Sequence, residues 1–178
     1  MKNTLIFAVI VSLAGISGFA LQRHLSESAA SAPIPLTHIA RPEFAMMDLD
    51  GELRDIKEWD GKVVMLNFWA TWCAPCMKEI PDLIELQDRY GEQGLQIISI
   101  AIDNEEAVRD FAEKTGINYP VMVGEQTAME ISSQYGNHIG GLPFTAVINR
   151  DGEITETIMG ALDLPRAQKI LSALGLDI

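Results

Sequence analysis

Two segments of the chain are apolar at nearly every position and have the length of a β-strand. They are residues 63–69 (VVMLNFW), interrupted only by Asn67, and residues 95–102 (LQIISIAI). A strand with apolar side chains on both of its faces is covered from both sides, as in the centre of an α/β sheet. We therefore predict a central strand over residues 63–69 and a second buried strand over residues 95–102.

Helical patterns separate and follow these strands. They run from the cysteines to Gly91, from Asn104 to Gly116, over 127–135 and over 163–173. Pro81 predicts a kink in the first helix, because proline removes a backbone hydrogen bond. Asn104 is followed by two glutamates, and this order of a polar cap and then acids is preferred at a helix start.

Two Asp-Gly pairs predict β-hairpins. Asp50-Gly51 lies within residues 44–56, and Asp151-Gly152 separates residues 144–149 from residues 153–159. Asp-Gly favours tight hairpin turns because glycine adopts a positive φ easily. With a short strand over 119–123, the predicted fold class is α/β: a central mixed β-sheet flanked by helices, with an added N-terminal β-hairpin.

The N-terminus has the layout of an export signal. Lys2 precedes an apolar run from Leu5 to Leu21 that is interrupted only by Ser and Gly. This run approaches the roughly 20 residues that span a bilayer, which favours an uncleaved anchor over a signal peptide cleaved near Ala20. Lys2 favours a cytoplasmic N-terminus with the domain on the far side of the membrane, although Arg23 weakens that bias.

The chain therefore divides into three parts. We predict a signal peptide or signal anchor in residues 1–24, a flexible tether in residues 25–40 and one folded domain in residues 41–178. After the leader, the chain holds 11 basic and 25 acidic residues, a net charge of −14. Nucleic acid is an unexpected partner, because binding it requires clustered Lys and Arg. This acidity is typical of a soluble surface, and it also suits attraction to a basic protein partner.

The two cysteines of the chain form a Cys73-Ala74-Pro75-Cys76 turn between a buried strand and a helix. Cys73 lies at the predicted helix N-terminus, where unpaired amides and the dipole stabilise a thiolate, so it is the expected nucleophile. Cys76 lies about one helical turn away and is the expected resolving cysteine. Ala74 and Pro75 are expected to tune the reduction potential.

Two structural interpretations compete with redox chemistry. A zinc site normally needs four ligands, and the histidines are scattered at positions 24, 38 and 138. A structural disulfide is permitted in an exported protein, but closing a two-residue loop constrains the unfolded chain only weakly. We therefore expect a redox-active pair, no bound metal and no cofactor.

Several motifs give the chain a family resemblance. They are Asn67-Phe68-Trp69-Ala70-Thr71-Trp72 before the cysteines, Pro42-x-Phe44, Gly61-Lys62, Cys76-x-x-Glu79-x-Pro81 and Gly141-Leu142-Pro143. In this order and spacing, from about Pro42 to Gly160, the chain resembles the TlpA- and ResA-like extracytoplasmic thiol–disulfide oxidoreductases. The resemblance implies a thioredoxin-like fold and a place in the bacterial periplasm or on the outer face of the cytoplasmic membrane.

The resemblance also implies contacts with a substrate. Pro143 matches the family's cis-proline, which presents the backbone of the preceding residue, here Leu142, to a substrate peptide. Trp72 matches an exposed tryptophan beside the nucleophile, whereas Trp69 is expected in the core. Phe144 departs from the polar residue that many relatives have after this proline, which leaves the partner-facing surface open.

Glu79 is the candidate for proton transfer. It matches a glutamate that influences proton chemistry in ResA-like proteins, and it shares a helical face with Cys76. Its alternative role is that of a solvated helix acid. Asn67 stands where thioredoxins have a buried aspartate and cannot accept a proton, so Glu79 is the remaining carboxylate.

Other functions on the same fold remain open. A peroxidase would carry Thr-x-x-Cys, which Thr71-Trp72-Cys73 does not match, and a metal-delivery module would gather soft ligands, whereas Met46-Met47 is the only methionine pair. The resemblance favours a reductant of exported protein thiols, on apocytochrome c or a copper-site protein, supplied by a membrane thiol donor. A thiol oxidant is the alternative.

Overall fold

A computed structural model describes residues 39–178 of the chain. The predicted leader, the anchor over residues 5–21 and nearly all of the predicted tether lie outside these residues. Among the described residues, no helix is long and apolar enough to cross a membrane.

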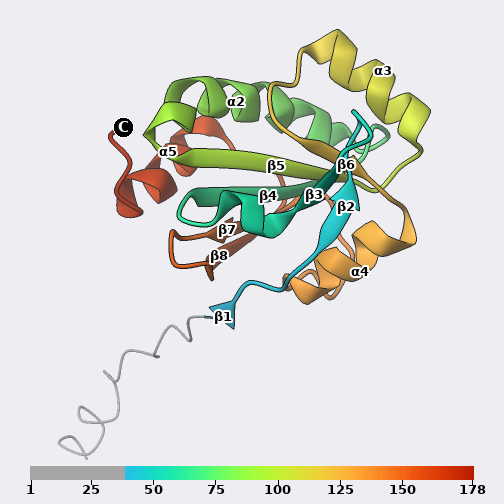
Figure 1. The fold of residues 1–178 in the computed structure, drawn as a ribbon. Coiled ribbons are helices and arrows are strands. Elements are labelled where there is room, and N and C mark those ends of the chain that lie inside the picture. The colour runs from blue at the N-terminus through green and yellow to red at the C-terminus, as the bar shows by residue number, and fades with distance from the viewer. Residues whose placement is uncertain (1–38) are drawn as a thin grey trace, which may run out of the picture. The chain divides into compact units, whose positions relative to one another are not determined.

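The described chain alternates strands and helices in the predicted order (Figure 1). The strands are β1 (Ile39–Ala40), β2 (Ala45–Met47), β3 (Leu53–Asp55), β4 (Val63–Trp69), β5 (Leu95–Ala101), β6 (Val121–Val123), β7 (Phe144–Ile148) and β8 (Glu153–Met159). The helices are α2 (Ala74–Tyr90), α3 (Glu105–Thr115), α4 (Gln126–Gln134) and α5 (Leu164–Ala173), with short 3-10 helices η1 (Ile56–Trp59) and η2 (Gly91–Gln93).

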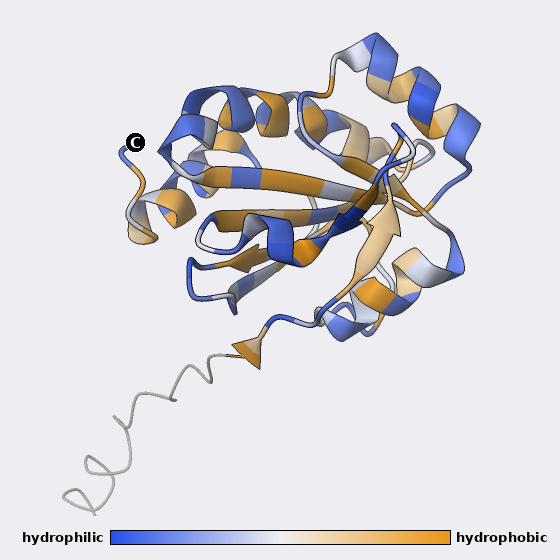
Figure 2. Cartoon of the chain, viewed as in Figure 1, coloured by the Kyte–Doolittle hydropathy of each residue, from blue (hydrophilic) through white to orange (hydrophobic). Residues whose placement is uncertain are grey.

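The main sheet is mixed, with the strand order β1-β8-β7-β4-β5-β6. β4 pairs in parallel with β5 and antiparallel with β7, and every residue of β4 and β5 is buried. The predicted central position of β4 is therefore confirmed, as is the thioredoxin-like α/β class. β4 and β5 are hydrophobic along most of their length in Figure 2.

Helices cover both faces of this sheet and enclose two hydrophobic clusters. One cluster lies under α2, α3 and α5 and includes Cys73, Cys76 and Trp69. The other lies under η1, α4 and the β2–β3 hairpin and includes Phe68 and Phe144. Because side chains alternate along a strand, neighbouring residues of β4 serve opposite faces. This alternation directs Trp69 toward the redox pair and Phe68 away from it.

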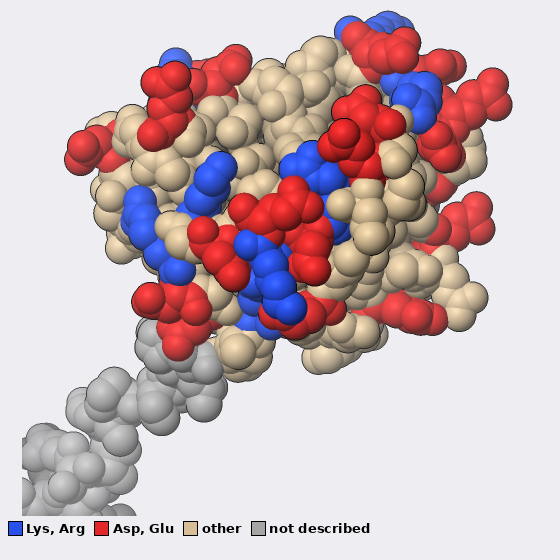
Figure 3. All heavy atoms as spheres, viewed as in Figure 1, with Lys and Arg blue, Asp and Glu red and all other residues tan. Residues whose placement is uncertain are grey.

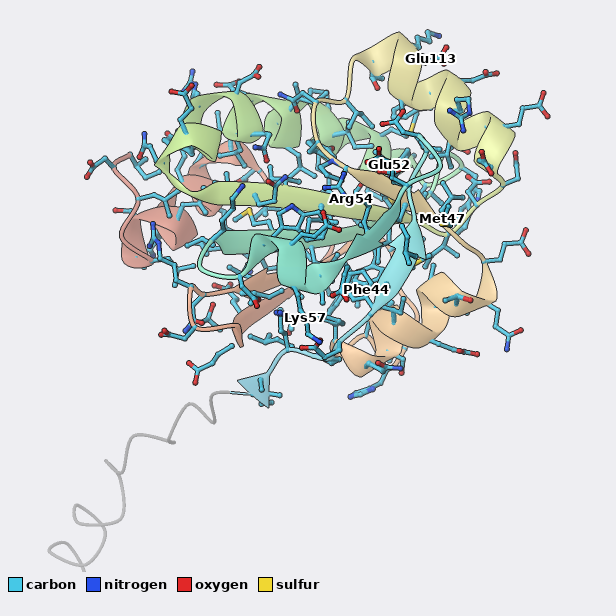
Figure 4. The ribbon with its side chains drawn as sticks, viewed as in Figure 1. Phe44, Met47, Glu52, Arg54, Lys57 and Glu113 are labelled. Carbon is cyan, nitrogen blue, oxygen red and sulfur yellow. A yellow bond between two sulfur atoms is a disulfide. The ribbon has the colours of Figure 1, made fainter. Side chains whose placement is uncertain are left out.

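Both predicted hairpins form at their Asp-Gly turns. β2 and β3 make a separate two-stranded sheet, and Gly51 and Gly152 have φ of 80° and 77°. The first hairpin carries interleaved charges, with Arg54 paired to Glu58 at 2.7 Å and near Glu52 at 4.0 Å (Figures 3 and 4). These partly exposed pairs account for the mixed acidic and basic surface there rather than for a binding site.

Some boundaries differ from the sequence prediction. β1 lies just before Arg41 and pairs with β8, so Ile39 and Ala40, which the sequence assigned to the tether, belong to the main sheet. β6 is shorter than residues 119–123, because Tyr119 turns into the core before Val121 begins pairing with β5. α2 runs through Pro81 as one helix, capped at its N-terminus by Cys73.

Candidate active site

Cys73 and Cys76 form a disulfide at the start of α2, with their Cα atoms 5.3 Å apart. Cys73 is the N-cap residue, and its Sγ accepts a hydrogen bond from the Cys76 backbone N–H at 3.3 Å. An amide N–H aimed at sulfur stabilises negative charge there, as expected at a helix N-terminus. The structure thus places Cys73 where the sequence predicts the nucleophile.

The surroundings of the pair are asymmetric. Cys73 is 6% exposed and Cys76 is fully buried, whereas Ala74 and Pro75 lie on the surface. Trp72 is 68% exposed beside Cys73. Cys73 is therefore the more accessible of the two cysteines.

The loop between β4 and the cysteines is held by a residue that sequence reasoning missed. The Thr71 backbone N–H and hydroxyl both donate to Asp103 Oδ2, at 2.9 and 2.5 Å. Burial raises the pKa of Asp103, but the hydrogen bonds from Thr71 and Asn104 outweigh burial and leave that pKa lowered. Asp103 follows a buried parallel strand, and such strand ends meet at one edge of a sheet, so its position offered a signal.

The peptide bond between Leu142 and Pro143 is cis, as predicted. Pro143 is buried, Leu142 is half-buried, and the Pro143 carbonyl accepts a hydrogen bond from the Gly160 N–H at 2.9 Å. At Gly141, an added Cβ would lie 2.8 Å from Met159 Sδ, so a larger residue there would displace Met159.

Asn137 fixes this loop and was not anticipated from the sequence. Its side chain is buried, donates to the Gly141 carbonyl at 2.9 Å and accepts from the Gly141 N–H at 3.1 Å. Asn137 also donates to Ser132 Oγ at 2.9 Å. The amide thereby mimics a backbone partner for Gly141 and sets the approach to the cis bond.

Glu79 is 2% exposed and is therefore not a solvated helix acid. Its Oε1 accepts from Asn67 Nδ2 and its Oε2 from the Leu162 N–H, both at 2.8 Å. Burial raises the pKa of Glu79 to about 7; the hydrogen bonds from Leu162 and Asn67 oppose this rise, and the charge of Asp82 adds to it. A carboxyl group with this pKa exchanges a proton near neutral pH.

Asn67 connects Glu79 to the strand that follows the cis-proline. Its Nδ2 donates to both Glu79 and Thr145 Oγ1, the latter at 3.0 Å. Phe144, in contrast, is 2% exposed and packs against Phe68 with ring centroids 6.0 Å apart. The aromatic residue after the proline therefore belongs to the opposite core and does not alter the partner-facing surface. Trp69 is fully buried, as predicted.

Among residues 39–178 there is no group of three or more His, Cys, Asp and Glu placed to hold a metal ion. His138 is exposed on the loop before Gly140, and the remaining two histidines lie outside the described residues.

A thioredoxin-like fold with an N-capping cysteine in a Cys-x-x-Cys turn and a cis-proline at the start of β7 is the arrangement of a thiol–disulfide oxidoreductase. The redoxin family profile matches residues 37–171, and the chain belongs to this family. The chain is 36% identical over 162 residues to the thiol-disulfide oxidoreductase ResA of Bacillus anthracis, covering 89% of this chain and 90% of that protein.

Other relatives belong to the same class of thiol–disulfide oxidoreductases. The chain is 37% identical over 120 residues to ResA of Halalkalibacterium halodurans, covering 67% of this chain and 66% of that protein. A thioredoxin-family thiol:disulfide interchange protein from Chlorobium tepidum superposes with a TM-score of 0.72 at 28% identity, covering 82% of this chain and 99% of that one. These relatives support protein thiols and disulfides as the class of substrate.

Proposed function

We propose that this protein is an extracytoplasmic thiol–disulfide reductant that transfers electrons from Cys73 and Cys76 to disulfides of exported proteins. Its proposed substrates are the cysteines of apocytochrome c or of a protein copper site, which must be reduced before they bind haem or metal. A membrane thiol donor returns the two electrons. Residues 1–24 and 25–40 serve as anchor and tether on the outer side of the cytoplasmic membrane.

The proposed reaction has two exchange steps. The Cys73 thiolate attacks one sulfur of the substrate disulfide, forms a mixed disulfide and releases the second substrate sulfur, which takes up a proton. Cys76 then loses its thiol proton, and its Sγ attacks Cys73 Sγ. The Cys73–Cys76 disulfide closes, the first substrate sulfur leaves, and two electrons have reached the substrate.

The remaining residues assist these steps. Trp72 and the backbone of Leu142, turned by cis-Pro143, receive the substrate segment beside Cys73. Glu79 accepts the Cys76 proton during resolution, since it lies one helical turn further along α2 and has a pKa near 7. Ala74 and Pro75 set the reduction potential through the helix start that they form.

The buried carboxyl group of Glu79 is the observation that carries the reductant assignment. Strong oxidants of this fold stabilise their reduced form through a thiolate. A carboxylate charge close to the pair works against a thiolate, so it destabilises the reduced form and makes the pair more reducing. Glu79 is also held in place at both oxygens, so its carboxylate stays in this position when it is ionised.

The reduction potential of the full-length protein tests the direction. Equilibration with thiol–disulfide buffers is expected to give a potential below about −180 mV. A value above this, toward the about −120 mV of a strong periplasmic oxidant, would overturn the reductant assignment.

Insulin reduction tests the chemistry itself. Cys73→Ser is expected to lower the rate by at least about 10³-fold, because the accessible nucleophile is lost and the remaining Cys76 is fully buried. Cys76→Ser is the matched control, since it keeps the nucleophile and should accumulate the mixed disulfide without turnover. Tight copper binding in place of turnover would contradict the proposal and favour a metal-delivery role.

A further inference from the structure

Four buried polar atoms have no hydrogen-bond partner within the protein, and they are the complete set among the described residues. They are Asn67 Oδ1, Trp69 Nε1, Ser99 Oγ and Tyr119 OH. Leaving such an atom unsatisfied costs about 1–3 kcal/mol, so native proteins rarely do so without a reason. Four such atoms among 140 described residues would be an ordinary number if they were scattered, but their positions are related.

Strand register places Asn67, Trp69 and Ser99 on one face of the sheet, and Tyr119 packs into the hydrophobic cluster on the same face. Asn67 on β4 is the register partner of Ser99 on β5, and Trp69 lies two residues further along the same face of β4. Ser99 donates its backbone N–H to the Pro120 carbonyl. Tyr119 directly precedes Pro120 and therefore lies beside β5 near Ser99. Trp69 and Tyr119 belong to the hydrophobic cluster that includes Cys76.

The chemistry of the four groups is complementary to that of water. Asn67 Oδ1 accepts, Trp69 Nε1 donates, and the hydroxyls of Ser99 and Tyr119 do both. A buried water typically makes two to four hydrogen bonds to groups that otherwise have no partner. Hydrophobic packing alone does not explain why β4, β5 and the segment before β6 all place polar atoms in the same layer.

We propose that Asn67, Trp69, Ser99 and Tyr119 form an internal water site that relays protons between Glu79 and solvent. This inference rests on the proposed role of Glu79 as the acceptor of the Cys76 proton. Glu79 is nearly inaccessible to solvent, so a proton that it accepts from Cys76 returns to that thiolate before the thiolate attacks, unless the proton has a route out of the core. Its Oε1 already contacts Asn67 Nδ2, and the other end of the same amide supplies the unpartnered Oδ1.

Tyr119 provides the outer end of the route. Burial raises the pKa of its hydroxyl, and the negative charge of Glu79 raises it further. Tyr119 also lines a surface pocket of about 450 Å³ whose other walls include Arg54 on β3 and Glu113 on α3 (Figure 4). The phenol therefore stands between the buried layer and a pocket that solvent can enter.

The proton balance of the relay is simple. During resolution the Cys76 thiol gives its proton to the Glu79 carboxylate, and Glu79 then passes one proton to the internal water. The water gives up another proton toward the Tyr119 hydroxyl, which releases one to the pocket, so each group returns to its starting state. The charged groups facing Glu79 are Asp82 on its own helix and, when ionised, Tyr119; from the β8–α5 loop it meets the Leu162 N–H.

Nuclear magnetic resonance of the full-length protein tests for the water. The Trp69 indole N–H should show a cross-relaxation peak to a long-lived water, and this peak should weaken in Ser99→Ala. Absence of the peak in the wild-type protein would overturn the proposal.

Measurements of thermal stability and of resolution rate distinguish a hydrated proton relay from four polar groups that have no water beside them. If water bonds the phenol, Tyr119→Phe should lower the Tm by a few degrees, whereas removing a dry unpartnered hydroxyl should raise it. Resolution of the mixed disulfide should slow about tenfold in Tyr119→Phe, with its pH profile shifted, while Cys73 alkylation is unchanged. Raised stability, or a long-lived water with an unchanged resolution rate, would each overturn the relay.

Tyr135→Phe is the matched control. Its hydroxyl is buried on the opposite face and donates to the Pro42 carbonyl at 2.6 Å. This variant should lose stability but resolve the mixed disulfide at the wild-type rate. Because wild-type insulin reduction is measured in parallel, a failure of the relay with intact turnover is distinguishable from a failure of the proposed function.

Discussion

The two faces of the central sheet bury different kinds of side chain. On the face toward η1 and α4, Phe44, Phe68, Phe144 and Tyr135 pack ring against ring, with centroids 6.0–6.4 Å apart, and the Tyr135 hydroxyl has a backbone partner. The face toward α2 holds the disulfide, a buried carboxyl group and polar atoms without partners. We infer that the first face mainly stabilises the fold. The second face keeps buried polar groups that lower stability and serve the redox reaction.

Phe68→Ala should have the largest effect on stability and should leave the redox pair on the other face unchanged. The side chain is fully buried among the rings, so its removal should lower the free energy of unfolding by about 3–5 kcal/mol. The reduction potential of the remaining folded protein should not change. Chemical denaturation and redox titration measure the two quantities, and Phe68→Leu, which loses less volume, should cost less than about 1.5 kcal/mol. A shifted potential would show that the faces are not independent.

Glu79→Gln changes the other face, and its effect on the free energy of unfolding should depend on pH. The pKa of Glu79 is about 7 in the folded protein and 4.5, its ordinary value, in the unfolded chain, so this group stabilises the fold fully below pH 4.5. That stabilisation, about 3 kcal/mol, is lost as pH rises through 7. Denaturation at pH 4.5 and 8 should show this fall in the wild-type protein and a smaller fall in the variant. Equal falls would mean that folding does not raise the pKa of Glu79.

Asn137→Ala should weaken the substrate-facing loop. It leaves Gly141 without two hydrogen bonds in a partly buried place, so the expected loss is about 1–3 kcal/mol in stability, together with a raised KM for insulin reduction. Thermal unfolding and steady-state kinetics measure both effects. His138→Ala, at the exposed neighbouring residue, should change neither, and an unchanged KM in Asn137→Ala would separate this loop from substrate binding.

Thr71→Val should have the smallest effect. It removes one hydroxyl bond to Asp103 and keeps the backbone bond, for an expected loss of about 1 kcal/mol. Thr71→Ser retains the hydroxyl and should behave as wild type. Urea denaturation of both variants gives the comparison, and equal stability of Val and wild type would mean that the hydroxyl adds nothing to the loop.

Local patterns predicted most of the fold and the reacting atoms of the site. The continuous apolar run of β4, the two Asp-Gly turns and the Asn104 cap act within a few residues, and the Cys-x-x-Cys turn carries its own geometry. The cis bond at Pro143 came from family resemblance.

The supporting contacts were missed because they join distant parts of the chain. Glu79 meets Leu162 across 83 residues, and Thr71 meets Asp103 across 32. Whether Glu79 is buried and which core receives Phe144 depend on strand pairing that no local pattern contains. Residue types alone therefore left Glu79 undecided between a surface acid and a buried one.

β1 has a consequence for the outer edge of the sheet. It pairs with β8 at Glu153 and Ile154, and among the described residues no other strand pairs with β8 on that side. An edge strand with unpaired backbone groups can recruit extended chains and start aggregation. Glu156, placed midway along β8, puts a charge where a foreign strand would have to pair. Because charged side chains on edge strands oppose edge-to-edge association, we expect Glu156 to disfavour self-association of the domain through β8.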